Sequence, residues 1–258
     1  MSTFLQKSPI FGPVLSRRFG VSLGVNLMPA SGKICTFDCL YCEDGLNAER
    51  RTRDTYVTMD VLAPALERAL SGIAERKEAL DEVCLAGNGE PTASPIFPQA
   101  VDLCRTLIDR YVPSAKLAVL SNGTMASRPE VHDALMRVDR NVLKLDTVDP
   151  DYIALLDRPQ VPYDVHKQVE AFASFGGHVI IQTIFVRGSY QGASLDNTDE
   201  AHVSAWLDAV EKIAPEAVTV YTIARDTPVS GIEKAPREVL DAIANRVRAL
   251  GIPCSASY

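Results

Sequence analysis

The chain has 258 residues, of which 47% are hydrophobic and 23% charged, and its formal net charge is −7. This is the composition of an ordinary globular protein, and it excludes a low-complexity chain. The acidic balance argues against broad binding to nucleic acid, although it does not exclude a local contact. The N-terminus has no basic segment followed by an apolar one, and no apolar run is long enough to cross a bilayer. We therefore expect a cytoplasmic protein that is not bound to a membrane.

From about residue 20 onward, short apolar runs alternate with amphipathic runs. The apolar runs, which predict strands, cover residues 21–27, 82–86, 117–120, 142–145, 178–185 and 217–221. The amphipathic runs, which predict helices, cover residues 60–76, 96–111, 131–138, 163–175, 198–213 and 236–250. Apolar runs of this length are typical of strands that are buried on both faces of a parallel sheet.

These runs form six βα units in series and predict an α/β fold. Right-handed crossovers in one sheet give either a doubly wound sheet or the wall of a barrel, and periodicity does not choose between them. No linker-like segment interrupts the units. We therefore expect one domain over residues 21–258, preceded by an N-terminal extension over residues 1–20.

Polar residues lie in the last part of the predicted strands or just after them, at the end where the chemistry of βα barrels gathers. Glycine, proline and asparagine at such places need only form turns. That explanation does not cover the charged and amide side chains found there, which are Glu90, Lys144, Gln182 and Arg225. This rim of the sheet is therefore the candidate site.

Three of the six cysteines stand in the sequence ICTFDCLYC, as Cys35, Cys39 and Cys42. In a reducing compartment, clustered thiols favour metal or redox chemistry over disulfides. A structural zinc site takes four ligands, and no fourth cysteine or histidine stands nearby in the sequence. Three thiolates can instead each bind one iron of a [4Fe-4S] cluster, which leaves the fourth iron open to a substrate or cofactor. The spacing favours such a cluster over zinc or over cysteines without a function.

The motif Cys35-x3-Cys39-x2-Cys42, with Tyr41 before its last cysteine, resembles that of the radical S-adenosylmethionine superfamily. The segment GNGEPT, which begins at Gly87, is similar to the glycine-rich Gly-Gly-Glu segment of that superfamily, with Asn88 as a departure. The segment GPVLSRRFGVSLGVNLMP resembles a subgroup of iron–sulfur oxidoreductases similar to wyosine-type tRNA modification enzymes. The resemblance covers roughly residues 11–252.

This resemblance implies a partial (β/α)6 barrel of the TIM type, with parallel strands and outer helices. It also implies a [4Fe-4S] cluster whose open iron binds S-adenosylmethionine through its amino and carboxylate groups. One electron from an external donor, such as flavodoxin or ferredoxin, would cleave S-adenosylmethionine to methionine and a 5′-deoxyadenosyl radical. The radical would then abstract hydrogen from a substrate that the sequence does not identify.

The resemblance further implies roles for single residues. Cys35, Cys39 and Cys42 would ligate iron. The residues expected to bind S-adenosylmethionine are Tyr41, Gly87, Gly89, Glu90, Ser121, Asn122, Lys144, Asp146, Gln182 and Arg225. Structural alternatives are a tight turn at the glycine segment, an Asn-Gly turn at Asn122, and a salt bridge between Lys144 and Asp146, which share a strand face.

Three other functions stay open at this point. Modification of a tRNA base would fit a local basic patch formed by Arg17, Arg18, Arg50, Arg51 and Arg53. A non-catalytic iron–sulfur electron carrier or sensor would need the cysteines but not the glycine segment. Activation of a partner enzyme through a glycyl radical would need a large protein partner.

Overall fold

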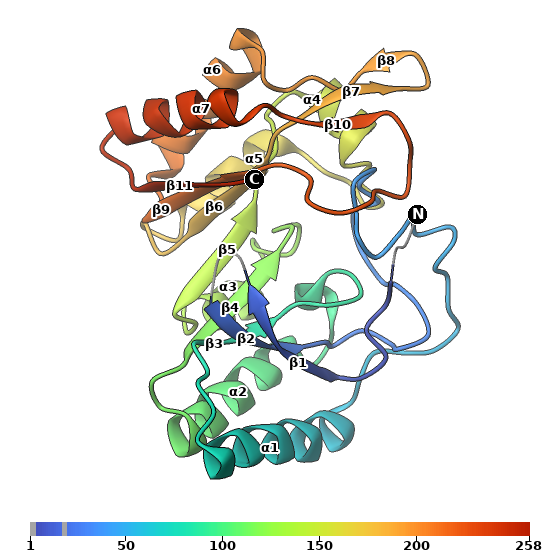
Figure 1. The fold of residues 1–258 in the computed structure, drawn as a ribbon, viewed down its shortest axis with the longest axis vertical. Coiled ribbons are helices and arrows are strands. Elements are labelled where there is room, and N and C mark those ends of the chain that lie inside the picture. The colour runs from blue at the N-terminus through green and yellow to red at the C-terminus, as the bar shows by residue number, and fades with distance from the viewer. Residues whose placement is uncertain (1–3, 17–19) are drawn as a thin grey trace.

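The computed structural model describes residues 4–16 and 20–258, and its centre is a curled sheet of eight strands (Figure 1). The order across the sheet is β1-β2-β3-β4-β5-β6-β9-β11. These strands are β1 (Ile10–Ser16), β2 (Gly20–Val25), β3 (Glu82–Leu85), β4 (Lys116–Ser121), β5 (Arg140–Lys144), β6 (Ile180–Ile184), β9 (Ala217–Tyr221) and β11 (Cys254–Ser257). Strand β1 is antiparallel to β2, and each pair from β2 to β11 is parallel. The curled parallel sheet is a half-barrel, so the predicted partial barrel is confirmed.

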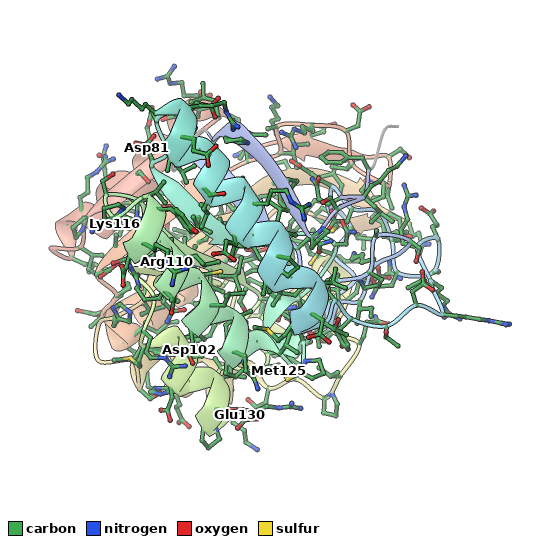
Figure 2. The ribbon with its side chains drawn as sticks, turned by 90° about the horizontal axis from the view of Figure 1, so that it is seen from below. Asp81, Asp102, Arg110, Lys116, Met125 and Glu130 are labelled. Carbon is green, nitrogen blue, oxygen red and sulfur yellow. The ribbon has the colours of Figure 1, made fainter. Side chains whose placement is uncertain are left out.

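Helices follow the parallel strands and cover the outer face of the sheet. They are α1 (Met59–Arg76), α2 (Phe97–Tyr111), α3 (Pro129–Leu135), α4 (Pro150–Leu156), α5 (Val165–Ala173), α6 (Glu200–Ile213) and α7 (Arg237–Ala249). Figure 2 shows α1, α2 and α3 side by side on the outside of the sheet. In the apolar stripe of α1, Leu62, Leu66 and Leu70 are fully buried, as the periodicity predicted. No helix among residues 4–16 and 20–258 is long and apolar enough to cross a membrane.

Some elements have no counterpart in the predicted pattern. Strand β1 lies within the stretch expected as an extension, and β11 adds a parallel strand beyond β9. A second, small sheet has the order β10-β7-β8, formed by β10 (Ile232–Lys234), β7 (Val186–Tyr190) and β8 (Ala193–Ser194). The sequence of β11, CSAS, is too polar to give an apolar run, and helix α4 is too short to show a helical period.

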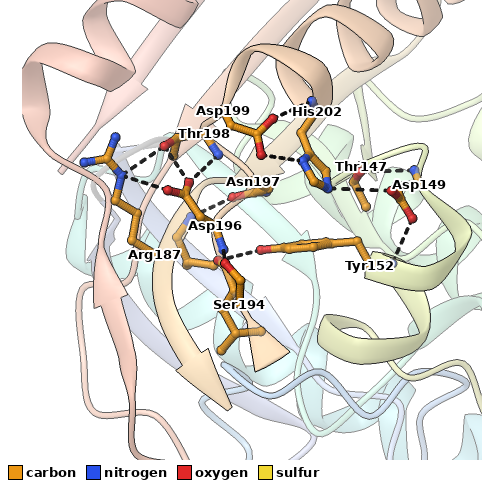
Figure 3. Close-up of polar contacts among 12 residues, drawn as sticks. Thr147, Asp149, Tyr152, Arg187, Ser194, Asp196, Asn197, Thr198, Asp199 and His202 are labelled. Carbon is orange, nitrogen blue, oxygen red and sulfur yellow. Dashed lines mark hydrogen bonds and ion pairs between the residues drawn. The ribbon is translucent and has the colours of Figure 1, made fainter. Parts of the chain in front are cut away.

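A polar cluster joins the N-termini of α4 and α6 beside the second sheet (Figure 3). Asp149 caps α4 by accepting hydrogen bonds from the backbone of residues 151 and 152, and Asp199 caps α6 in the same way. The His202 ring lies between them, with Nδ1 3.0 Å from Asp199 Oδ2 and Nε2 3.8 Å from Asp149 Oδ2. The Asn197 amide donates to the backbone oxygens of Asp146 and Ile184, so this cluster fixes the ends of β5 and β6.

Candidate functional site

A cavity of about 180 Å³ lies where the C-terminal ends of the central strands meet the cysteine loop. Its lining residues are Cys35, Phe37, Cys39, Tyr41, Cys42, Gly89, Glu90, Leu120, Ser121, Asn122, Val142, Lys144, Gln182 and Tyr221. The lining includes every residue predicted for the site except Gly87, Asp146 and Arg225. The structure therefore brings residues from the ends of five strands, β3, β4, β5, β6 and β9, and from the cysteine loop to one place.

The cysteine loop is held against the glycine segment by backbone pairing. Ile34 N donates to the carbonyl of Asn88 at 3.1 Å, and Glu90 N donates to Ile34 O at 3.0 Å. Gly89 between them has φ +130°, and a Cβ added there would lie 1.9 Å from Ile34 O. Only glycine permits this close approach. Gly89 therefore allows Ile34, the residue before Cys35, to pair with the glycine segment.

The three thiols of the loop are free, and they are buried to different extents. Cys39 is buried, whereas Cys35 and Cys42 are partly buried. Loop residues 38 and 40 donate backbone hydrogen bonds to the C-terminal end of α4, at the carbonyls of Asp157 and Leu156. In the described part of the chain, no three His, Cys, Asp or Glu side chains are grouped around a position for one metal ion. A cluster requires a different arrangement, because each thiolate then binds its own iron.

Glu90 is almost fully buried and ties the end of β3 to the end of β4. Its Oε1 accepts hydrogen bonds from Thr92 N at 2.9 Å, from Thr92 Oγ1 at 2.5 Å and from Ser121 Oγ at 2.7 Å. Its Oε2 accepts one hydrogen bond, from Asn122 N at 2.7 Å. Burial raises the pKa of Glu90, and these hydrogen bonds oppose the rise. Since a carboxylate oxygen can accept two or more hydrogen bonds, Oε2, which has one donor, can accept another.

The side chain of Asn122 is occupied by the cysteine loop and by its own turn. Its Nδ2 donates to Thr36 Oγ1 at 2.8 Å and lies 3.7 Å from Cys35 Sγ. Its Oδ1 accepts hydrogen bonds from Thr124 N and Thr124 Oγ1. Asn122 therefore combines the Asn-Gly turn, the structural alternative, with direct support for the first cysteine.

Lys144 and Asp146 form the salt bridge that was the structural alternative for this pair. Lys144 Nζ lies 3.0 Å from Asp146 Oδ2 and also pairs with Asp157. Burial alone would lower the pKa of Lys144, but the two carboxylates hold it well above its ordinary value. The oxygens of Asp146 also accept hydrogen bonds from Tyr41 OH at 2.5 Å and from Ile184 N at 3.1 Å. Of the pair, only Lys144 lines the cavity, and Asp146 positions Tyr41.

The remaining predicted residues lie in different surroundings. Gly87, with φ +146°, packs against the side chain of Asn26 outside the cavity lining. Gln182 lines the cavity, and its Oε1 is buried without a hydrogen-bond partner among the described residues. Arg225 pairs with Glu43 at 2.5 Å in the wall of a neighbouring cavity of about 320 Å³. The two cavities share Tyr41, Cys42, Leu120 and Tyr221.

Two residues of the site had no role in the predictions. Lys33 is 5% exposed, and its Nζ donates to Cys42 Sγ at 3.3 Å and to Gly45 O at 2.8 Å. Asn88, which was seen only as a departure from a motif, is fully buried and bonds both backbone groups of Gln6. A signal for Lys33 was its place two residues before the first cysteine.

The predicted basic patch is described only in part. Arg17 and Arg18 lie outside the described residues. Arg51 and Arg53 are exposed, and Arg50 is partly buried. Modification of tRNA therefore stays a prediction.

Comparison with known proteins gives relatives in sequence and in structure. No family model matches the chain. The UPF0026 protein of Helicobacter pylori strain J99 is 29% identical over 235 residues, which are 90% of this chain and 71% of that protein. A radical SAM methyltransferase from Sphaerobacter thermophilus superposes with a TM-score of 0.66 at 15% identity, over 92% of this chain and 66% of that one. SuiB of Streptococcus suis, solved with S-adenosylmethionine, superposes with a TM-score of 0.65 at 15% identity, over 91% of this chain and 50% of that one.

The chain thus spans from half to just under two thirds of the length of these two solved enzymes. At such low identity the likeness concerns the fold. The expected relation to wyosine-type enzymes stays a prediction. What the comparisons establish is that the chain has the partial-barrel fold found in radical S-adenosylmethionine enzymes.

Proposed function

We propose that this protein is a radical S-adenosylmethionine enzyme. Cys35, Cys39 and Cys42 would hold a [4Fe-4S] cluster, and S-adenosylmethionine would bind beside it in the smaller cavity. One observation carries the proposal: the three thiols share that cavity with the polar ends of the central strands. A simple electron carrier needs a buried cluster but has no use for a second binding cavity next to it.

The residues present suit both groups. The three thiols are free and lie near two buried ammonium groups, those of Lys33 and Lys144, which offset the charge of an anionic cluster. Soft thiolates are the ligands that iron–sulfur clusters prefer. For S-adenosylmethionine, Glu90 Oε2 can accept a hydrogen bond from an amino group, and the unpartnered Oε1 of Gln182 is a second acceptor.

The apolar part of the lining would shield the reacting groups from water. The rings of Phe37, Tyr41 and Tyr221 and the side chains of Leu120 and Val142 provide this surface. Tyr41 is held in place because its hydroxyl is bonded to the buried Asp146. When bound, the cluster and S-adenosylmethionine would supply reductive cleavage of the sulfonium and abstraction of hydrogen from the substrate.

The larger cavity is the natural place for the substrate. It shares a wall with the smaller cavity, so a molecule bound there would lie next to S-adenosylmethionine. Its volume of about 320 Å³ suits a small molecule or a single side chain of a larger substrate. Ile184 and Ile223 give it apolar walls, and the Arg225–Glu43 ion pair gives it a polar edge.

Cleavage of S-adenosylmethionine by the reconstituted protein tests the proposal. After anaerobic reconstitution with iron and sulfide, dithionite and S-adenosylmethionine should yield 5′-deoxyadenosine even without a substrate. The same yield with reduced flavodoxin or ferredoxin would identify the class of electron donor. Cys39→Ala should lose the cluster and the product, whereas Cys104→Ala, a control buried on α2, should keep both. A cluster that forms without cleavage would indicate a carrier and contradict the proposal.

A further inference from the structure

We propose that Lys33 raises the reduction potential of the cluster, by donating a charged hydrogen bond to the sulfur of Cys42. The inference rests on the proposed function only in assuming a cluster on the three cysteines. It assigns a role to a residue outside the cysteine motif and outside the cavity lining.

The ammonium group of Lys33 is held rigidly against the cysteine loop. Its Nζ lies 3.3 Å from Cys42 Sγ and 2.8 Å from the carbonyl oxygen of Gly45. The backbone N of Lys33 donates to Arg50 O at 2.9 Å, and the next residue is paired with Asn88. Hydrogen bonds therefore fix both the backbone of Lys33 and its ammonium group.

The ammonium groups of Lys33 and Lys144 differ in the groups that offset their positive charge. Lys144 is paired with two carboxylates. Within residues 4–16 and 20–258, no carboxylate forms an ion pair with Lys33, and Asp44 acts on it only from a longer distance. Its neighbours are instead a sulfur and a carbonyl oxygen. A buried cation is disfavoured unless negative charge lies close to it, and Asp44 is farther from the Lys33 ammonium than the sulfur is, so the structure points to an anionic group at Cys42.

A fixed cation at this place acts on the redox equilibrium of the cluster. Reduction adds one electron and no proton, so the reduced cluster is one unit more negative than the oxidised cluster. A nearby buried positive charge stabilises the reduced form more than the oxidised form, and a hydrogen bond to a ligand sulfur acts in the same direction. Lys33 would therefore ease the entry of the electron from the external donor.

The midpoint potential of the reconstituted cluster tests this role, measured by redox titration in the absence of S-adenosylmethionine. Lys33→Met should make the midpoint potential more negative by at least about 59 mV. For one electron, this shift corresponds to a tenfold change in the equilibrium constant of reduction. Lys33→Gln should shift it in the same direction but less, and Lys33→Arg should stay near wild type. Lys167→Met, an exposed control on α5, should leave the potential unchanged.

Iron content and the absorbance of the cluster, measured on the same samples, show whether each variant is loaded. A wild-type potential in fully loaded Lys33→Met would overturn the inference. If that variant does not load, the Gln and Arg variants decide: a lower potential in Gln than in Arg supports the role, and equal potentials overturn it. Loss of the cluster from all three would also overturn it, because Lys33 would then serve only to hold the loop. Failure of the wild type to cleave S-adenosylmethionine would contradict the proposed function without changing this measurement.

Discussion

Gly89→Ala tests how the site is assembled, because this glycine seats the cysteine loop on the barrel. The added Cβ would lie 1.9 Å from Ile34 O, and the residue would keep φ +130°. Backbone strain of this kind costs about 1–3 kcal/mol. The two backbone hydrogen bonds of Ile34 would be lost as well, at about 1 kcal/mol each. We therefore expect the free energy of unfolding to fall by about 3–5 kcal/mol.

The matched control is Gly251→Ala, at the end of α7. Gly251 also has a positive φ, +80°, but nothing lies within 4 Å of an added Cβ. In Gly251→Ala, the free energy of unfolding should fall only through strain of the backbone, by about 1–2 kcal/mol. Urea unfolding gives both free energies, and iron per chain after anaerobic reconstitution reports on the loop. Equal stability of the two variants, with full iron in Gly89→Ala, would refute this account of the loop.

Two further predictions concern residues that support the site and the sheet. Asn88→Ala should lower the free energy of unfolding by about 2–3 kcal/mol, because the Asn88 amide makes three hydrogen bonds. The variant should also speed hydrogen exchange at the backbone amide of Gln6, and unchanged exchange there would contradict the hydrogen bonds assigned between Asn88 and Gln6. Burial alone would raise the pKa of Asp139, but hydrogen bonds from Leu117 N and Arg105 hold it below its ordinary value. The ionised carboxylate therefore stabilises the fold above the unfolded pKa of about 3.9, and this stability is lost as the pH falls through the lower folded pKa. Asp139→Asn should destabilise the cluster-free chain by about 1–2 kcal/mol at pH 7 and by less near pH 3, as measured by urea unfolding; an equal loss at both pH values would show that the charge has no part in it.

Six of the seven parallel strands and their helices could be predicted because each buries a continuous apolar run or stripe. The sequence shows no apolar run at β11, because Cys254–Ser257 are small and mostly polar. This strand is placed by its pairing with β9. The second sheet was missed for a similar reason. Its strands are short, and their order depends on contacts between distant segments, which periodicity does not report.

The candidate site was predictable in its location more than in the orientation of its side chains. Glu90 follows a parallel strand and Ser121 and Gln182 lie within the C-terminal parts of two others, which places them at one rim, and the structure brings them to one cavity. The sequence offered the salt bridge between Lys144 and Asp146 only as an alternative, and it gives no sign that Tyr41 would also bond Asp146. Whether a polar side chain contacts a ligand or a neighbouring side chain depends on packing. Packing depends on the whole fold, so the sequence pattern does not reveal it.

The central claim is that three cysteines hold a cluster whose fourth iron is open to S-adenosylmethionine. The most direct test is the electron paramagnetic resonance spectrum of the reduced cluster, recorded before and after S-adenosylmethionine is added. A ligand that binds the open iron should change the spectrum of the wild-type protein. An unchanged spectrum at saturating S-adenosylmethionine, or a site that binds zinc in place of a cluster, would contradict the account.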